Sequence, residues 1–119
     1  QLDAAGKHLL SNGITSMHDA GVGRGVYDFY IKQAVQAELP IRIYAMISAT
    51  DPDLSKLLGK GPIRDANDYL YIRSVKAYGD GALGSRGAAL LAPYSDAPHA
   101  VVYVGHRRWV SIKLPRYWR

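Results

Sequence analysis

Three β-rich segments that alternate with helical segments constrain most strongly how this chain of 119 residues can fold. Branched and aromatic residues, which favour strands, gather at residues 14–18, 41–48 and 71–78. Apolar residues at helical spacing precede and separate these runs, at residues 2–10, 26–38 and 51–58. Strands that alternate with helices form parallel βαβ units. The pattern therefore predicts an α/β fold and leaves open whether the sheet is open or closes into a barrel.

Turn-forming residues mark the boundaries between these segments. Asn12-Gly13 predicts the end of the first helix, because both residues tolerate the left-handed backbone of a helix end. The glycines of residues 21–25 predict a loop after the first strand. Pro40 prevents the second helix from continuing, and residues 61–68 are predicted to form a loop.

The composition excludes several classes of protein. The chain has no cysteine, which rules out disulfides, zinc sites built on thiolates and cysteine nucleophiles. No apolar run approaches the roughly 18 to 20 residues of a membrane-spanning helix, so no membrane partner is expected. Residues 1–10 lack the charged start and the continuous apolar stretch of a signal peptide, and a cytoplasmic location is the corresponding expectation.

The charge is distributed unevenly along the chain. The net charge is +5, yet the Lys and Arg residues of 1–98 are balanced by its acidic residues, and the whole excess lies in residues 99–119. That segment has no acidic residue and carries both tryptophans. We therefore divide the chain into a neutral body, residues 1–98, and a basic, aromatic tail, residues 99–119. A nucleic-acid binder acting through this tail is one alternative function.

Glycines at positions 79, 81 and 84 match the spacing of a dinucleotide-binding loop. The segment that follows is short and ends at Pro93, and it has no acidic residue about 20 positions on for a ribose. A nucleotide site is therefore disfavoured. Asp80 and Arg86 flank the same loop, where they either bind a polar substrate or pair with each other.

Two further positions carry side chains suited to chemistry. Lys76 lies in an apolar stretch just before the glycine loop, where it either reaches into solvent or lies in a pocket as a Schiff-base or carbamate-forming lysine. His18-Asp19 lies where the first strand is predicted to end, the edge at which α/β folds bind ligands. His18 could act as a base or ligand with Asp19 orienting it, or the pair could pack and cap the loop.

Four blocks of sequence resemble one family in the same order. They are residues 13–21 (GITSMHDAG), 39–47 (LPIRIYAMI), 75–91 (VKAYGDGALGSRGAALL) and 93–98 (PYSDAP). They are similar to the amidohydrolase family 3 group, which includes the YtcJ-like and N-substituted formamide deformylase-like metal-dependent hydrolases. The resemblance implies a (β/α)8 TIM-type hydrolase barrel, of which this chain supplies about three βα units. It also implies hydrolysis of amide-like carbon–nitrogen bonds by a metal-activated water, with zinc as the expected divalent metal.

The family's metal centre uses a His-x-His motif, a lysine on the fourth strand, two later histidines and a late aspartate. By resemblance Lys76 matches the lysine, while His18, Asp19, Asp80 and Arg86 match positions that line the pocket. No His-x-His occurs in this sequence. We therefore expect an amidohydrolase fragment that is inactive alone, with residues 99–119 arising from a shifted frame or a truncated end. The alternative is a non-catalytic α/β module that self-associates through its open sheet edges.

Overall fold

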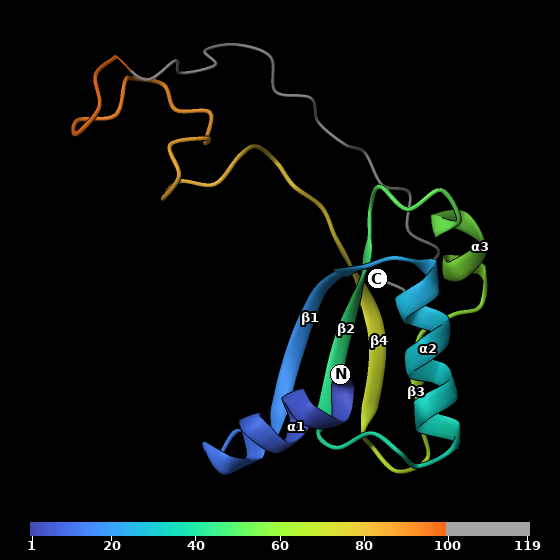
Figure 1. Cartoon of the computed structure of the whole chain (residues 1–119). Helices are drawn as coiled ribbons and strands as arrows, with labels where there is room; N and C mark the ends of the chain where they lie inside the picture. The colour runs from blue at the N-terminus through green and yellow to red at the C-terminus, as the bar shows by residue number, and fades with distance from the viewer. Residues whose placement is uncertain (100–119) are drawn as a thin grey trace. The chain divides into compact units, whose positions relative to one another are not determined.

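The computed structural model describes residues 1–99. They belong to two units, residues 1–77 and residues 78–99, which are treated separately below (Figure 1). Apart from His99, the basic tail predicted at residues 99–119 lies outside the described residues. No helix within residues 1–99 is long and apolar enough to cross a membrane.

The first unit is a mixed α/β domain built on a four-stranded sheet. Its elements in chain order are α1 (Leu2–Ser11), β1 (Ser16–Val22), α2 (Arg24–Val35), β2 (Arg42–Ser48), α3 (Leu54–Gly59), β3 (Ile63–Arg64) and β4 (Leu70–Lys76). The strand order is β1-β2-β4-β3. β1 pairs with β2 and β2 pairs with β4, both in parallel. The predicted α/β class and its parallel βαβ units are therefore confirmed.

Several predicted boundaries differ from the structure. β1 runs to Val22, because Gly21 is absorbed as a bulge, with a φ of +105°, where a loop was predicted. α2 ends at Val35 instead of residue 38, since Ala37 has a φ of +55° that no helix accommodates. The predicted loop at 61–68 contains the short strand β3, which pairs antiparallel with β4.

The hydrophobic core lies between the sheet and the two helices that connect its parallel strands. α2 and α3 lie on the same side of the sheet (Figure 1). β2 contributes Ile43, Ala45 and Ile47, each at most 1% exposed. Tyr27, Tyr30 and Ala34 of α2, Leu57 and Leu58 of α3, and Leu70 and Ile72 of β4 complete much of this core. The apolar face predicted for the second helix is thus the face that packs on the sheet.

The opposite face of the sheet is concave near the carboxyl ends of its strands. A Cβ atom placed on Gly21 of β1 would lie 3.8 Å from Cγ of Lys76 on β4, although β2 lies between these strands. Strands two positions apart lie about 9 to 10 Å apart in a flat sheet. Residues of β1 and β4 come within 8 Å of each other, measured between Cα atoms, so the sheet curls. Lys76 therefore lies inside the curl, on the face without helices.

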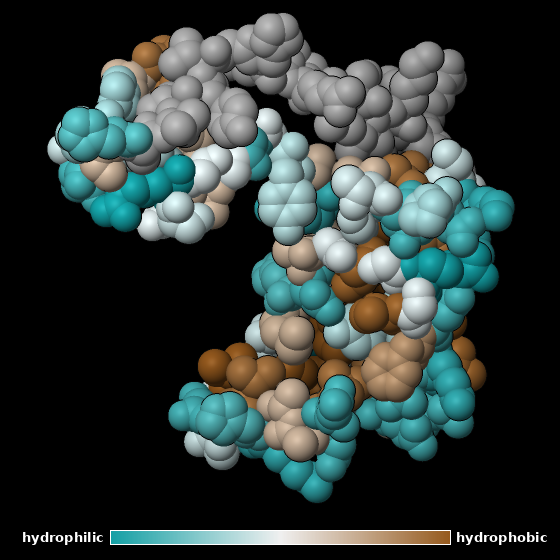
Figure 2. Space-filling model, turned by 45° about the horizontal axis from the view of Figure 1, so that its top comes forward, coloured by the Kyte–Doolittle hydropathy of each residue, from teal (hydrophilic) through white to brown (hydrophobic). Residues whose placement is uncertain are grey.

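The surface of the first unit leaves several large apolar side chains open to solvent. Leu10, Ile14, Val26 and Phe29 are each between 42% and 46% exposed. Figure 2 shows hydrophobic residues, in brown, lying between hydrophilic ones on the visible face. Single exposed apolar residues of this kind are ordinary on a protein surface.

α1 docks on the rest of the unit through a glycine. Gly6 is the buried residue of this helix, and a Cβ atom there would overlap the ring carbons of Pro40, just before β2. Glycine is otherwise unfavourable inside a helix, by about 0.5 to 1 kcal/mol relative to alanine. Close packing against Pro40 explains why a glycine stands at this position.

We predict that Gly6→Ala lowers the free energy of unfolding by about 1 to 3 kcal/mol, because the added methyl group overpacks the contact with Pro40. Gly25→Ala in α2 is the matched control, since nothing lies within 4 Å of a Cβ atom there. The control should be neutral or gain up to about 1 kcal/mol from helix propensity. Urea unfolding followed by circular dichroism measures both, and a Gly6→Ala chain as stable as the control would contradict the packing argument.

Candidate functional site

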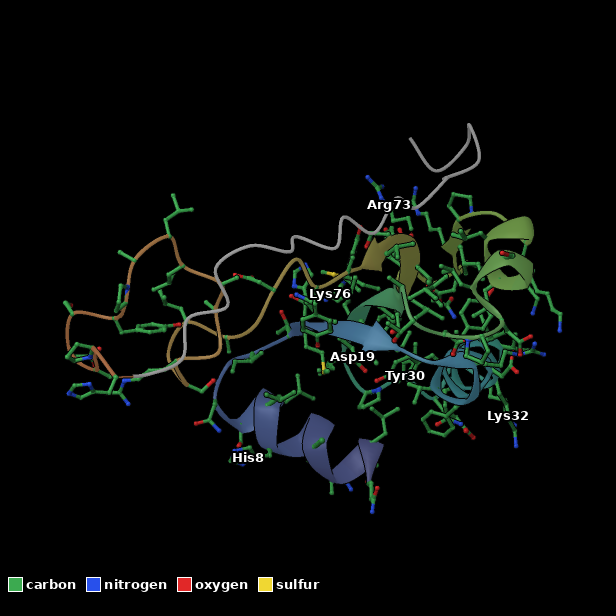
Figure 3. The ribbon with its side chains drawn as sticks, turned by 90° about the horizontal axis from the view of Figure 1, so that it is seen from above. His8, Asp19, Tyr30, Lys32, Arg73 and Lys76 are labelled. Carbon is green, nitrogen blue, oxygen red and sulfur yellow. The ribbon has the colours of Figure 1, made fainter. Side chains whose placement is uncertain are left out.

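The register of the sheet arranges the side chains of the concave face in rows. Lys76 is paired with Ser48 at the carboxyl end. The next row is Ala20, Met46 and Ser74, and the row after it is His18, Tyr44 and Tyr71. Side chains alternate between the two faces of a strand, and an irregularity in β4 between Ile72 and Ser74 places Ser74 and Lys76 beside Met46 and Ser48, so these residues share the face opposite α2. Figure 3 shows Lys76 on the side of the sheet away from Tyr30.

His18 lies in the middle of β1, because the strand continues past its predicted end. Its side chain is exposed, and its ring centroid lies 5.1 Å from that of Tyr44 at an interplanar angle of 44°. His18 is thus on the same face as Lys76, separated from it by the row that contains Met46.

Asp19 faces the other side of the sheet, toward α2. The Tyr30 hydroxyl donates a hydrogen bond of 2.7 Å to Oδ2 of Asp19, and Figure 3 shows the two side chains pointing toward one another. Burial raises the pKa of Tyr30, and the hydrogen bond to Asp19 raises it further. Adjacent residues of a strand point to opposite faces, so the structure separates Asp19 from His18. Asp19 connects β1 to α2.

Asp80 and Arg86 belong to the second unit, where each holds the loop together. Oδ2 of Asp80 accepts a hydrogen bond of 3.0 Å from the backbone N–H of Ala89. Arg86 forms an ion pair with Asp96 at 2.8 Å, so the pairing of Asp80 with Arg86 that was considered above is not what the structure shows. A Cβ atom on Gly81 would overlap the carbonyl oxygen of Gly87, which explains a glycine of the predicted motif by close backbone approach.

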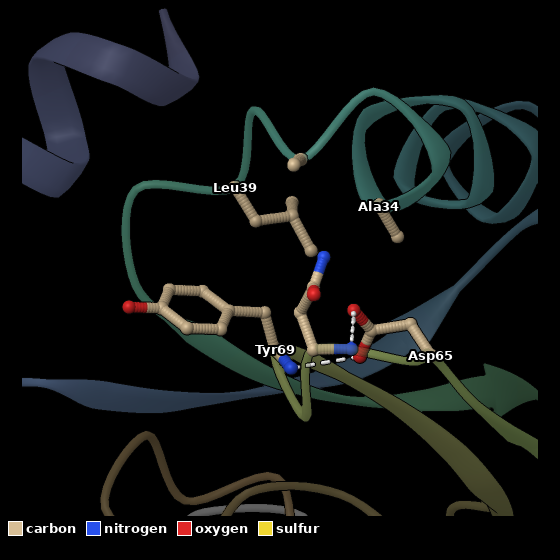
Figure 4. Close-up of a pocket in the computed structure, with 6 residues that line it drawn as sticks. Ala34, Leu39, Asp65 and Tyr69 are labelled. Atoms are coloured by element: carbon tan, nitrogen blue, oxygen red, sulfur yellow. Dashed lines mark hydrogen bonds between the residues drawn. The ribbon is translucent and has the colours of Figure 1, made fainter.

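A pocket of about 370 Å³ lies at the opposite end of the sheet from Lys76. It is lined by Ala34, Ala37, Leu39, Asp65, Asn67 and Tyr69 (Figure 4). Oδ1 of Asp65 already accepts the backbone N–H groups of Tyr69 and Leu70, at 2.7 and 2.6 Å. That carboxylate shapes the turn before β4, and the chemistry-bearing side chains lie elsewhere.

Asp68 is held beside this turn by two partners. Arg64 donates to both of its carboxylate oxygens, and the Tyr71 hydroxyl donates a hydrogen bond of 3.0 Å. These hydrogen bonds, that from Arg64 above all, lower the pKa of Asp68 to about 2. The cluster fastens β3 to β4.

The described residues do not by themselves fit a metal centre. Within residues 1–99, no group of three or more His, Cys, Asp or Glu side chains is placed to hold a metal ion. Lys76 is a single predicted ligand, whereas a catalytic zinc needs three protein ligands. We derive no hydrolytic step through a metal from these residues.

Comparisons with protein-family models and with curated proteins found no match. Two solved structures do match. An uncharacterized metal-dependent hydrolase from Pyrococcus horikoshii OT3 aligns over 82% of this chain with 29% identity and a TM-score of 0.67. An uncharacterized metal-dependent hydrolase from Pyrococcus furiosus aligns over 81% with 31% identity and a TM-score of 0.67.

This chain spans only 20% of the length of either hydrolase. The resemblance is therefore to part of a metal-dependent hydrolase. The narrower resemblance to amidohydrolase family 3 stays a prediction from the sequence.

Ser74 and Tyr30 are the residues of this region that sequence reasoning missed. The sequence does indicate Ser74, because a residue two positions before Lys76 on a strand is expected to lie on the same face. The contact of Tyr30 with Asp19 joins a helix to a strand, and no spacing in the sequence reveals it.

We predict that Tyr30→Phe lowers the free energy of unfolding by about 1.5 to 3 kcal/mol, the range for a hydrogen bond to a charged group. Tyr27→Phe is the matched control on the same helix, because the buried Tyr27 hydroxyl has no hydrogen-bond partner among the described residues. The control should be neutral or slightly stabilising. Urea unfolding compares the two, and equal effects would show that the Asp19 contact contributes nothing.

We also predict that the chain loses stability as the pH falls from about 4 to about 2. Because the pKa of Asp68 is lowered by folding, its ionised form stabilises the fold above its ordinary pKa, and that contribution is lost as the pH approaches about 2. Asp68→Asn should flatten the pH dependence of the free energy of unfolding in this window. An unchanged slope, with the exposed Asp3→Asn as control, would refute the assignment.

Proposed function

We propose that this chain is part of a metal-dependent amidohydrolase with a (β/α)8 barrel, which cleaves amide-like carbon–nitrogen bonds of small molecules. The observation that carries the proposal is the position of Lys76. It ends β4 on the concave face, at the edge of a parallel sheet where barrel enzymes place their chemistry. The likeness to two metal-dependent hydrolases supports it.

Three features of the first unit support a barrel. β1, β2 and β4 pair in chain order, as successive barrel strands do. Both connecting helices lie on the convex side, and the sheet curls toward the other side. β1 has no neighbour on its outer side among the described strands, which leaves an edge that a preceding strand would cover.

In the proposed whole protein, Lys76 would be one ligand of a divalent metal, with zinc as the candidate, and the bound metal would supply Lewis-acid activation of water. The remaining ligands, a His-x-His motif, two histidines and an aspartate, are proposed to come from further chain. His18 lies on the concave face, which suits a pocket-lining role. Asp80 and Arg86 are proposed to line the pocket from the loop that follows β4. The 119-residue chain alone is proposed to be inactive.

The coding DNA around this chain provides the first test. We predict that one frame upstream of Gln1 encodes a His-x-His motif, and that some frame after Pro98 continues into an apolar strand and later histidines. Sequencing several hundred bases on both sides measures this. A clean frame bounded by Gln1 and Arg119 would overturn the proposal and favour a non-catalytic module that self-associates through the outer edge of β1.

In the protein restored from that frame, Lys76→Met should lower metal content and hydrolysis of N-substituted formamides together. Loss of a hydrogen bond to a metal-ligating side chain lowers metal affinity or activity roughly 10- to 100-fold. Loss of the ligand itself should lower them further. Lys32→Met is the control, because Lys32 is exposed on α2. Metal content equal in the two variants would show that Lys76 is not a ligand.

A further inference from the structure

We propose that Asn12 is a modification site, at which the side-chain amide is converted to a carboxylate through reaction with the backbone nitrogen of Gly13. Both residues lie between α1 and β1, before the amino end of the sheet, whereas Lys76 lies at its carboxyl end. The modification therefore does not depend on the proposed hydrolase. Three features point to it: the order Asn-Gly, the exposure of both residues and the way in which α1 ends.

The end of α1 explains why a glycine follows Asn12. The backbone N–H of Gly13 donates a hydrogen bond of 2.9 Å to the carbonyl oxygen of Leu10, and Gly13 has a φ of +75°. The N–H of Ile14 donates one of 3.0 Å to the carbonyl oxygen of Leu9. These two bonds around a left-handed residue form the Schellman ending of a helix, which favours glycine. Nothing lies within 4 Å of a Cβ atom placed on Gly13, so its nitrogen is sterically open.

The reaction needs only water as a co-reactant. The Gly13 nitrogen loses its proton and bonds to Cγ of Asn12, while the bond from Cγ to Nδ2 breaks and ammonia leaves with a proton. The product is a cyclic imide, which water opens at either carbonyl carbon. Opening at the side-chain carbonyl gives aspartate, and opening at the backbone carbonyl gives isoaspartate. In sum, an amide and water give a carboxylate and an ammonium ion.

The folded end of α1 holds the two reacting groups in separate hydrogen bonds. Nδ2 of Asn12 donates a bond of 2.8 Å back to the carbonyl oxygen of His8, and the Gly13 nitrogen donates to Leu10. Both bonds must open before the imide can form. Only Gly6 of α1 is buried, and Leu9 is partly buried against the core. Local opening of such a helix end requires much less free energy than unfolding of the whole chain, so the end of α1 controls the rate.

The product changes how α1 ends. A carboxylate at position 12 cannot donate to the His8 carbonyl, and its negative charge lies at the helix C-terminus, where the helix dipole disfavours it. Isoaspartate also adds a carbon atom to the backbone before Gly13, which shifts the N–H groups that close the helix. We therefore expect the modified chain to exchange the amide hydrogen of Ile14 faster than the original chain.

Incubation of the full chain in mildly alkaline buffer, followed by mass spectrometry of its peptides, tests the proposal. We expect Asn12 to convert in the folded chain, with isoaspartate among the products, roughly tenfold or more slowly than in urea, because two hydrogen bonds must open first. Asn67, the other asparagine of the chain, is the internal control. It is also exposed, and the N–H of the residue after it, Asp68, is hydrogen-bonded too. Because Asp68 has a side chain and a negative charge, Asn67 should remain an amide.

A pair of leucine variants tests the control by α1. Leu9→Ala removes a side chain that packs against the core, so it should free the end of α1 and speed the conversion of Asn12 several-fold. Leu10→Ala makes the same change at the next position, where the side chain is 46% exposed, and it should leave the rate unchanged. The comparison of the folded chain with the urea-unfolded chain does not depend on how well either variant folds.

Three results would overturn the proposal. The first is an Asn12 that stays an amide in the folded chain after the unfolded chain has converted. The second is conversion of Asn67 as fast as that of Asn12, which would show that the Asn-Gly order has no special reactivity here. The third is an equal rate in folded and unfolded chains or in the two leucine variants, which would show that the end of α1 does not control the reaction.

Discussion

The parallel pairing of β2 with both of its neighbours is the constraint on which the rest of the first unit depends. β2 hydrogen-bonds to β1 on one side and β4 on the other, and Ile43, Ala45 and Ile47 place its helix-facing side in the core. Parallel neighbours require long crossover connections. The chain therefore passes through α2 between β1 and β2, and through α3 between β2 and β4. The burial of that face by two helices leaves the other face for chemistry.

The period of two along a strand then sorts neighbouring polar residues into different roles. Asp19 accepts a hydrogen bond from the Tyr30 hydroxyl on the helix side, whereas His18, one position earlier, lies beside the ring of Tyr44 on the concave side. Lys76 and Ser74 share the concave side because they are two residues apart. A polar residue next to a candidate site residue in the sequence is therefore the residue least able to act with it.

Much of this architecture could be predicted from the sequence, and the failures have physical causes. Periodicity located all three long strands and the helices between them, since burial of one face imposes that pattern. It misplaced the end of β1, because Gly21 signals a loop and a bulge equally well. It missed β3, which is two residues long and carries no alternation. The partner of Arg86 was also missed, because Asp96 lies ten residues away and only the folded loop brings the two together.

A comparison of the two ends of the sheet shows why the candidate site is assigned from the chemistry of its side chains and not from the presence of a pocket. The 370 Å³ pocket at the amino end contains the carboxylate of Asp65, but this group already accepts hydrogen bonds from the backbone of the turn before β4. Asp68 beside it is neutralised by Arg64. At the carboxyl end, Lys76 lies on the face away from α2, where the described residues of β1, β2 and β4 include no acidic side chain. Groups that already satisfy one another stabilise a fold, which is why the candidate site is assigned to the carboxyl ends of the parallel strands, where α/β proteins bind their ligands.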